Sequence, residues 1–328
     1  MMHFIGIDVS KNKFDVCWLR DTTNNKRKTK VFTNKQEGHK ALAEWLLNNI
    51  KAAPENIVII LEPTGVYHES MMYSLHDMGF KVYLVNASNA KKYAEAINLT
   101  HKTDKSDACM LANYGYAQQS NLKLWLPEAV EVRELKALLR RLDALESDYQ
   151  RELNRLDSSE FSLSSERVLA SLKEMIRALK SEIEKLKKDI DNHINGHPKL
   201  KNNRKLLESI PGIGSVLSRE LTYLFAAKKF KNAKQVGAYS GLIPKFHESG
   251  KLKGRTTLSK TGPSRLRAKL YMAAVVAGRY NKSVMRQKET LLKRGKTMMQ
   301  VIGANMRKLM QICFGVVKNQ TEYQPQVT

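Results

Sequence analysis

The sequence predicts an α/β domain at the N-terminus, then a long α-helical hairpin, then a mainly α-helical, strongly basic part. Three observations predict this order. Strand-like and helix-like patterns alternate over residues 1–125, and residues 128–192 contain neither glycine nor proline. Glycine-bounded turns then separate helical patterns in the last third of the chain. A chain of 328 residues is long enough for two domains, or for one domain with a helical extension.

The first strands are predicted from short apolar or alternating runs. They are HFIGIDVS (3–10), FDVCWLR (14–20) and KTKVFTN (28–34), and short turns between them favour an antiparallel meander. Alternating helices and strands follow. The expected helices are 36–50, 65–78, 88–98 and 104–119, and the expected strands are 56–64 and 81–87. Three hairpin strands followed by alternating helix and strand is the order of the RNase H-like fold, which we therefore expect for residues 1–125.

Residues 126–195 are predicted to form an antiparallel helical hairpin or coiled coil. Two ladders of apolar residues keep a spacing of three and four, with a serine-rich turn at 157–166 between them. Their members are Leu135, Leu138, Leu142, Leu145, Tyr149 and Leu156, then Leu169, Leu172, Ile176, Leu179, Ile183, Leu186 and Ile190. The ladders can pack on the protein body or on a second subunit. We favour a second subunit, because so regular a seam on a thin hairpin needs a partner.

Residues 195–200 are expected to be a linker, residues 196–320 a basic helical domain and residues 321–328 a polar tail. Helices are expected within 205–221, at 233–243, and at 263–280, 282–294 and 297–318, with a basic loop over 243–267.

The positive charge of the chain lies almost entirely in the C-terminal part. The net charge is +24, and residues 196–328 hold 27 lysines and arginines against five glutamates and no aspartate. Such a surface favours nucleic acid, through contacts to phosphates. A membrane surface is the weaker candidate, since no basic helix has a face rich in Trp and Phe. No run of about 18 apolar residues is present and Asp8 precedes any signal-like stretch, so we expect a cytoplasmic protein. Three scattered cysteines argue against a zinc site.

Four carboxylates in the N-terminal part form a candidate metal site. Asp8 closes the first strand and Glu62 the central one, so neighbouring strands would bring both to one edge of the sheet. Asp104 and Asp107 are three apart at a helix start and share a face. Such a set suits two Mg²⁺ ions about 4 Å apart, one activating the attacking oxygen and one stabilising the leaving oxygen of a phosphodiester. The alternative is that Asp104 only caps its helix and Glu62 is a loop residue.

A glycine-rich turn lies in LLESIPGIGSVLSREL and resembles a helix-hairpin-helix element. Pro211 would end one helix, and Gly212 and Gly214 would let backbone N–H groups approach a phosphate at the start of the next. A plain tight turn between helices is the equal alternative.

The carboxylate motifs also resemble those of a known family. GIDVSK with Asp8, LEPTG with Glu62 and KTDKSDA with Asp104 and Asp107 resemble the DEDD signature of the insertion-sequence transposase family numbered one hundred and ten. Its N-terminal domain is RuvC-like, and a helical hairpin and a transposase domain with an IPGIG turn and a basic region follow, as in this chain. The resemblance therefore covers nearly the whole sequence, and no catalytic position is missing.

The resemblance gives a role to Ser249, which the residues alone would assign only to a loop. It matches the ESG serine that forms a covalent phosphoserine link to DNA in such transposases, which leaves a free 3′-OH for strand exchange. Ser240 and Ser259 are the nearest alternatives. The basic residues expected to contact phosphates nearby are Lys251, Lys253, Arg255, Lys260, Arg265, Arg267 and Lys269.

The sequence thus predicts a DNA transposase that moves an insertion sequence by Mg²⁺-assisted serine chemistry. The family resemblance further implies a structured bridge RNA that pairs with donor and target DNA. It also implies a dimer that assembles into a tetramer, in which Ser249 of one protomer completes the carboxylate site of another. The alternatives are a RuvC-like nuclease or junction resolvase, which would need no serine, and a non-enzymatic nucleic-acid-binding protein.

Overall fold

The computed structural model describes residues 2–24, 26–99, 103–162, 164–245, 248–249, 252–253 and 256–325. The chain divides into two compact units, Met1–Pro127 and Glu128–Thr328.

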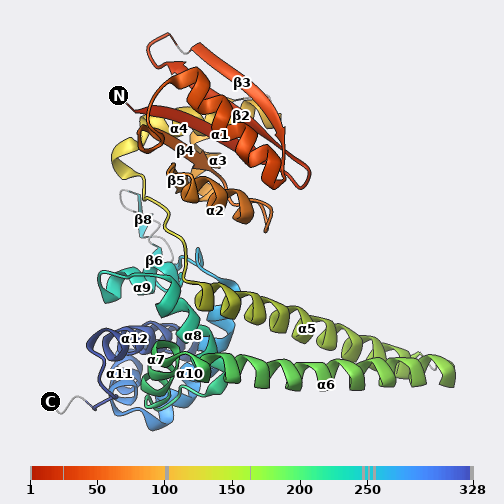
Figure 1. Cartoon of the computed structure of the whole chain (residues 1–328). Coiled ribbons are helices and arrows are strands. Elements are labelled where there is room, and N and C mark those ends of the chain that lie inside the picture. The colour runs from red at the N-terminus through yellow and green to blue at the C-terminus, as the bar shows by residue number, and fades with distance from the viewer. Residues whose placement is uncertain are drawn as a thin grey trace. The chain divides into compact units, whose positions relative to one another are not determined.

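The N-terminal unit is built on a five-stranded sheet in the order β3-β2-β1-β4-β5 (Figure 1). The strands are β1 (His3–Val9), β2 (Lys13–Asp21), β3 (Lys26–Thr33), β4 (Ile57–Leu61) and β5 (Lys81–Leu84). The first three form an antiparallel meander, and β4 and β5 run parallel to β1. This order and these directions are those of the RNase H-like fold, so the predicted fold class of the N-terminal unit is confirmed.

Helices cover both faces of this sheet. They are α1 (Gln36–Ile50), α2 (Glu69–Asp77), α3 (Ala87–Ala96) and α4 (Asp104–Ala117), with short 3₁₀ turns η1 (Pro54–Asn56) and η2 (Gln119–Asn121). Side chains alternate along each strand, so Ile5 and Ile7 pack in one cluster with Leu42 of α1 and Met71 of α2. Phe4 faces the opposite side and packs in a second cluster with residues of α3 and α4.

Gly6 lets α4 lie directly on β1. A Cβ atom at this position would lie 2.0 Å from the carbonyl oxygen of Ala108 and 2.4 Å from the backbone nitrogen of Ala112. The helix backbone therefore approaches the strand more closely than any side chain permits. This close approach fixes the start of α4 beside the end of β1.

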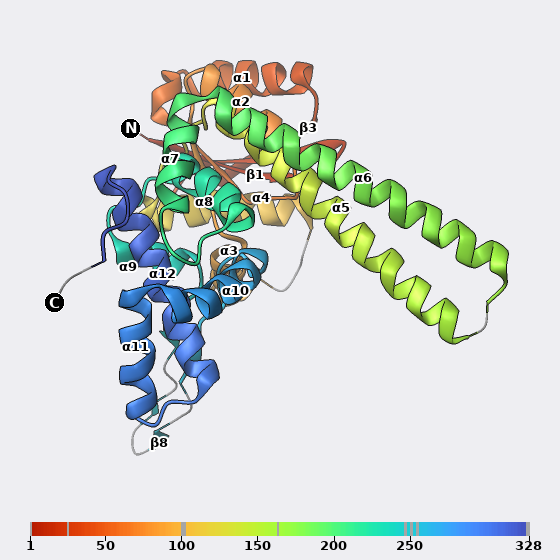
Figure 2. The same ribbon diagram turned by 90° about the horizontal axis from the view of Figure 1, so that it is seen from below.

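The C-terminal unit begins with two long helices, α5 (Val130–Phe161) and α6 (Glu166–Gly196), which lie side by side (Figure 1 and Figure 2). Leu139 and Leu142 of α5 pack with Ile190 and Ile194 of α6 near the base of this hairpin. The apolar ladders therefore face each other there. In the described part of the outer half, residues 153–179, the leucines and isoleucine of the two ladders are half-buried, and Phe161, Val168 and Met175 are exposed.

The linker expected over 195–200 is wrong. Only His197 separates α6 from α7 (Pro198–Glu208), because Pro198 takes the first helical position, where a missing N–H costs nothing.

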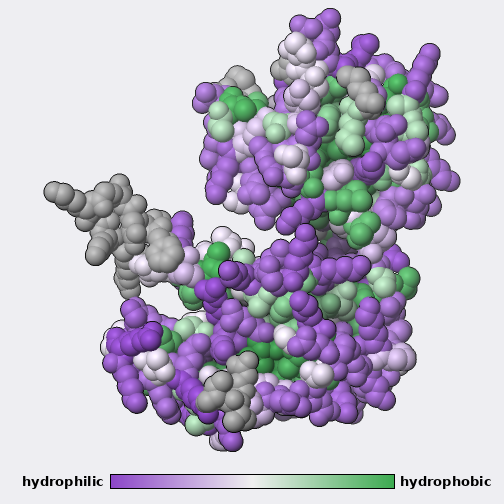
Figure 3. Space-filling model, turned by 90° about the vertical axis from the view of Figure 1, so that its left-hand side faces the viewer, coloured by the Kyte–Doolittle hydropathy of each residue, from purple (hydrophilic) through white to green (hydrophobic). Residues whose placement is uncertain are grey.

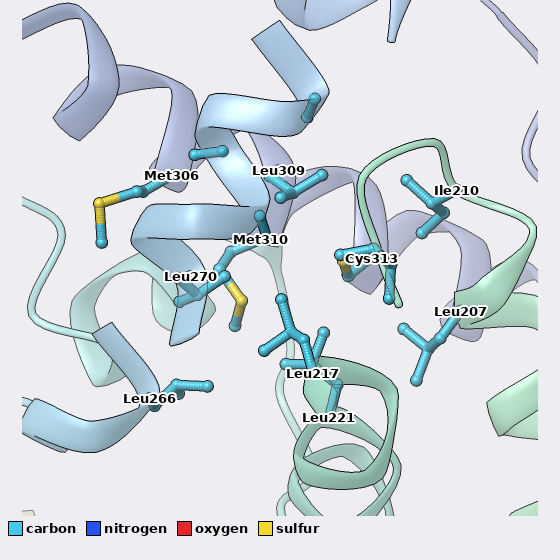
Figure 4. Packing of buried hydrophobic residues seen from close by; sticks show 14 of the residues in the cluster. Leu207, Ile210, Leu217, Leu221, Leu266, Leu270, Met306, Leu309, Met310 and Cys313 are labelled. Atoms are coloured by element: carbon cyan, nitrogen blue, oxygen red, sulfur yellow. The ribbon is translucent and has the colours of Figure 1, made fainter. Parts of the chain in front are cut away.

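The remaining helices form the body of this unit. They are α8 (Ser215–Ala227), α9 (Ala233–Tyr239), α10 (Ser264–Tyr280), α11 (Lys282–Lys293) and α12 (Met298–Asn319). Their core gathers leucines, methionines and Cys313 from α8, α10 and α12, together with leucines of α7 (Figure 4). In the stretch expected to be a basic loop, β6 (Pro244–Lys245) pairs with β9 (Thr257–Leu258), and β7 (Glu248–Ser249) pairs with β8 (Leu252–Lys253).

Across the described residues, the helices are either too short or too polar to traverse a lipid bilayer. Hydrophilic residues dominate the face shown in Figure 3.

Candidate active site and nucleic-acid interface

Asp8 near the end of β1 and Glu62 just after β4 lie close together. β1 and β4 pair in a register that sets Ile7 opposite Leu61, the last residue of β4, so the next residues of the two chain segments are Asp8 and Glu62. Gly6 and Ile60 face the side of the sheet that α4 covers. Asp8 and Glu62 come two residues later, and since side chains alternate along a strand, they face the same side. The strand ends therefore direct two carboxylates to the face of the sheet that α4 covers.

Asp104 and Asp107 occupy the first turn of α4, and neither is its cap. Thr103 is the capping residue, because its Oγ1 accepts a hydrogen bond from the Ser106 N–H (3.1 Å) and Ser106 Oγ accepts one from the Thr103 N–H (2.8 Å). The alternative explanation of Asp104 as a helix cap therefore does not apply. Both aspartates lie in the turn just before Ala108, whose backbone contacts β1 at Gly6.

Asp8 lies within reach of the charges of the other candidate carboxylates. Burial, and after it the charges of neighbouring carboxylates, together raise the pKa of Asp8 to about 6. These neighbours are Asp107, Asp104, Asp15 and Glu62, in decreasing order of effect. The strands and the helix thus gather a set of negative charges around Asp8.

Asp15 and Lys13 of β2 belong to the same cluster and were missed by the sequence reasoning. Asp15 lies directly opposite Asp8 in the β1–β2 register and is only 8% exposed. Lys13 Nζ lies 3.0 Å from Asp15 Oδ2 and 2.9 Å from Asp104 Oδ2. The signal in the sequence was an aspartate within an otherwise apolar strand, at a position that the meander pairs with Asp8.

The donor set suits a hard divalent cation. All candidate ligands are carboxylate oxygens, and burial together with neighbouring negative charges raises the pKa of Asp8, two effects that a bound cation would oppose. Within the described part of the chain, no three His, Cys, Asp or Glu side chains are already in ligand geometry. Asp104 instead contacts the Lys13 ammonium, whose hydrogen bond lowers the pKa of Asp104.

The glycine turn of the C-terminal unit joins α7 to α8 and is held by buried ion pairs. Arg219 of α8 is buried and donates two hydrogen bonds to Asp191 of α6 (2.8 and 2.7 Å). Arg204 of α7 donates to the same carboxylate (2.7 Å). These contacts fix the three helices around the turn.

The two glycines of that turn differ in surroundings. Gly212 has a φ of +103°, and a Cβ there would lie 2.7 Å from the Ala277 Cβ, so Gly212 is required for packing against α10. Gly214 is the N-cap of α8, and a Cβ there would meet nothing within 4 Å. Of the two, Gly214 therefore has the open surroundings that a phosphate at the start of α8 would need.

Ser249 lies in β7, where it pairs with Leu252 of β8. Among the predicted phosphate contacts, Lys253 lies in β8, while Lys251 and Arg255 lie outside the described residues. The alternative nucleophile Ser240 is fully buried, and its Oγ donates to the Val236 carbonyl (2.9 Å). Ser259 is partly exposed, with its Oγ 3.4 Å from Thr261 Oγ1.

Three of the predicted phosphate contacts at α10 already have partners in the protein. Arg265 Nη1 lies 2.8 Å from Asp143 of α5, and Lys269 contacts both Asp143 and Glu220 of α8. Burial favours the neutral amine of Lys269, but the charges of Glu220 and Asp143 raise its pKa overall. Arg267 donates to the Gly262 carbonyl. Lys260, by contrast, is exposed in the turn before α10.

We expect Lys269→Met to destabilise the fold by about 1–2 kcal/mol, because it removes the cation that contacts Glu220 and one of the two cations that contact Asp143 in a partly solvated site. Lys260→Met is the matched control on an exposed residue. Lys260→Met should change the free energy of unfolding by less than about 0.5 kcal/mol. It should also reduce the slope of log binding constant against log salt concentration by about one, as expected for the loss of one phosphate contact. Thermal unfolding and DNA titrations at several salt concentrations measure both effects. An unchanged unfolding temperature for Lys269→Met would contradict the structural role.

Comparison with known proteins gives consistent matches along the chain. Residues 5–159 match the DEDD profile of IS110 type described as "Transposase", and residues 204–289 match "Transposase IS116/IS110/IS902 family". The "Pilin gene-inverting protein" of Moraxella lacunata is 32% identical over 99% of this chain and 98% of its own length. The "Transposase for insertion sequence element IS1111A" of Coxiella burnetii is 21% identical over 88% of this chain and 81% of its own.

Among solved structures, Thermus thermophilus RuvC in complex with a Holliday junction substrate is 12% identical, covers 38% of this chain and all of its own, and superposes with a TM-score of 0.29. The fold assignment of the N-terminal unit rests on its strand order and directions. The two matched profiles and the full-length similarity to curated relatives define the family. The chain belongs to the IS116/IS110/IS902 family of transposases and is, as a member of that family, an enzyme of DNA recombination.

Proposed function

We propose that this protein excises and inserts a mobile insertion sequence by Mg²⁺-assisted strand cleavage with Ser249 as the nucleophile. The observation that carries the proposal is the convergence of Asp8, Glu62, Asp104 and Asp107 at one edge of the sheet, with the charges of the other three raising the pKa of Asp8. Nucleases and recombinases of the RNase H-like fold need such a set of carboxylates to hold divalent ions at a phosphodiester.

The four carboxylates would hold Mg²⁺, most simply as two ions. Bound Mg²⁺ supplies positive charge that offsets the charge developing on the scissile phosphate. The protein positions the ligands for these ions. The register of β1 and β4 brings Glu62 close to Asp8, and the capping box orients the turn that bears Asp104 and Asp107. Because the pKa of Asp8 in the protein without metal is about 6, protons compete with Mg²⁺ for this carboxylate, and metal binding should weaken as the pH falls below about 6.

Ser249 would carry the covalent step. Its Oγ forms a bond to the scissile phosphorus, the bond from phosphorus to the 3′ oxygen breaks, and the serine proton ends on that oxygen as a free 3′-OH. The link conserves the energy of the phosphodiester, so strand exchange needs no nucleotide triphosphate. The buried position of Ser240 supports Ser249 over that alternative.

We further propose that the site is composite, with Ser249 of one protomer serving the carboxylates of another in a tetramer built from dimers. The hairpin of α5 and α6 supports this as a coiled-coil assembly device. Its outer half leaves Leu153, Leu156 and Ile176 half-buried, and a second copy would cover them.

DNA and a structured guide RNA are the proposed partners. The 27 lysines and arginines of residues 196–328, against five acidic residues, form a polyanion-binding part that donor DNA, target DNA and a bridge RNA would share. Action on DNA places the protein in the bacterial or archaeal cytoplasm, at the nucleoid.

DNA inversion is a second candidate, favoured by one observation. The full-length relatives with the higher identities, 32% and 31%, are named pilin gene-inverting proteins, whereas the named transposases are 21% and 23% identical. The strand chemistry is the same in both cases, and the arrangement of the two DNA sites decides between inversion and excision.

A reconstituted reaction tests the proposal. The protein is purified from cells that carry the DNA flanking its reading frame, co-purifying RNA is sequenced, and plasmids with paired sites are incubated with Mg²⁺ or with EDTA. We expect strand exchange only with Mg²⁺ and the flank-encoded RNA. Exchange in EDTA would contradict the metal requirement, and exchange without RNA would contradict guided targeting.

A further inference from the structure

Lys13 inserts a positive charge into the carboxylate cluster. Its Nζ bridges Asp15 of its own strand (3.0 Å) and Asp104 of α4 (2.9 Å). The two partners differ in surroundings: the Asp15 side chain is 11% exposed, whereas that of Asp104 is 54% exposed. The lysine therefore has one sheltered and one open carboxylate within hydrogen-bond distance.

The strand geometry sets this arrangement. Lys13 and Asp15 are two residues apart on β2 and so face the same side of the sheet, the side on which Asp8 lies opposite Asp15. The Lys13 ammonium thus contacts Asp104, one of the proposed metal ligands. An exposed ion pair of this kind is worth only about 0.2–1 kcal/mol, so a divalent cation can displace it.

We propose that Lys13 is a built-in counter-ion that competes with the divalent metal for Asp104, and that Asp15 is the second carboxylate that retains the lysine when the metal binds. The proposal rests on the metal site of the proposed function. Lys13 and Asp15 are then positioning residues. Before a metal ion binds, Lys13 neutralises and orients the Asp104 carboxylate. After it binds, Asp15 holds the displaced ammonium beside the site.

A double-mutant cycle distinguishes the proposed transfer of Lys13 from Asp104 to Asp15 from a general effect of charge on metal affinity. The proteins are wild type, Lys13→Met, Asp15→Asn and the double variant, and the probe is Mn²⁺ alone, with free Mn²⁺ measured by its electron paramagnetic resonance signal. Lys13→Met should tighten Mn²⁺ binding by up to about fivefold, the ratio equivalent to an exposed ion pair. Asp15→Asn should weaken binding when Lys13 is present and weaken it clearly less in the Lys13→Met background, where only the loss of its own charge remains.

Lys11→Met is the matched control, since it removes an exposed lysine two residues away. It should alter Mn²⁺ affinity less than Lys13→Met does. Circular dichroism and thermal unfolding of each variant confirm that the proteins remain folded.

Acylation of Lys13, followed by mass spectrometry, provides a second readout. In wild type, Mn²⁺ should leave Lys13 protected, because Asp15 retains it; in Asp15→Asn, Mn²⁺ should make Lys13 several-fold more reactive. The proposed role of Lys13 would be overturned, with the metal site left in place, by either of two results. One is that Asp15→Asn weakens Mn²⁺ binding equally in both backgrounds, and the other is that Lys11→Met and Lys13→Met change Mn²⁺ affinity identically. A wild-type protein that binds no Mn²⁺ would overturn both the role of Lys13 and the metal site.

Discussion

Asp8→Asn is expected to abolish DNA cleavage and, at the same time, to stabilise the metal-free protein at neutral pH. Loss of a ligand at the sheet edge removes charge stabilisation worth several kcal/mol, which corresponds to a fall of about a hundredfold or more in cleavage rate. Stability should rise because burial and four neighbouring carboxylates oppose the charge of Asp8. The gain should be about 1–2 kcal/mol, once solvent screening of this partly exposed group is taken into account.

The pH dependence of this effect has a definite sign. The pKa of Asp8 is raised from 3.8 to about 6 in the folded protein, so between about pH 4 and pH 6 the folded state binds a proton that the unfolded state has released. The contribution of Asp8 to stability is therefore favourable below about pH 4 and is lost as the pH rises through about 6. Asp8→Asn and wild type should then differ in unfolding temperature at pH 7.5, with Asp8→Asn the more stable, and should converge near pH 4.

Asp21→Asn is a suitable control, because hydrogen bonds from Asn24 lower the pKa of Asp21 and its charge is favourable in the fold. This control should not gain stability at pH 7.5. Thermal unfolding in EDTA and a cleavage assay in Mg²⁺ measure the two effects of Asp8→Asn. A variant that cleaves at the wild-type rate would show that Asp8 is not a ligand.

Ser249→Ala should eliminate covalent protein–DNA complexes and strand exchange while leaving DNA and metal binding intact. The hydroxyl is the only group that the substitution removes, and in the proposed mechanism it is the group that holds the phosphate between cleavage and strand exchange. Denaturing gels of labelled DNA detect the covalent complex, and filter binding detects the DNA affinity. We expect at least about a thousandfold loss of strand exchange, as for other essential nucleophiles.

Ser259→Ala is the matched control, as a partly exposed serine in the same basic stretch. It should retain covalent complexes. Hydrolytic cleavage that persists at full rate in Ser249→Ala would instead indicate a water-using nuclease of the junction-resolvase kind.

Much of the N-terminal unit could be predicted from sequence because its signals are local. Apolar strands, a three-four helical spacing and the positions of Asp8 and Glu62 at strand ends are all visible within a few residues. The site residues missed, Lys13 and Asp15, needed the β1–β2 register, since nothing in KNKFD shows that Asp15 faces Asp8.

The C-terminal unit shows where local reasoning stops. The linker at 195–200 was inferred from Gly196 and Pro198, but Pro198 starts a helix rather than breaking one. In the sequence, Lys269 lies in a basic stretch with no acidic residue near it. Its partners Asp143 and Glu220 are 126 and 49 residues away in the chain. A short stretch of sequence cannot reveal ion pairs between residues so far apart in the chain.

The most direct test of the central claim, a metal-assisted serine recombinase, is to map the covalent adduct. Wild-type protein is incubated with Mg²⁺, its guide RNA and a nicked DNA substrate that traps the intermediate, then digested and analysed by mass spectrometry. We predict a nucleotide phosphodiester on the peptide that contains Ser249, absent in EDTA and in Asp8→Asn. Cleaved DNA with no adduct on any serine would contradict the account.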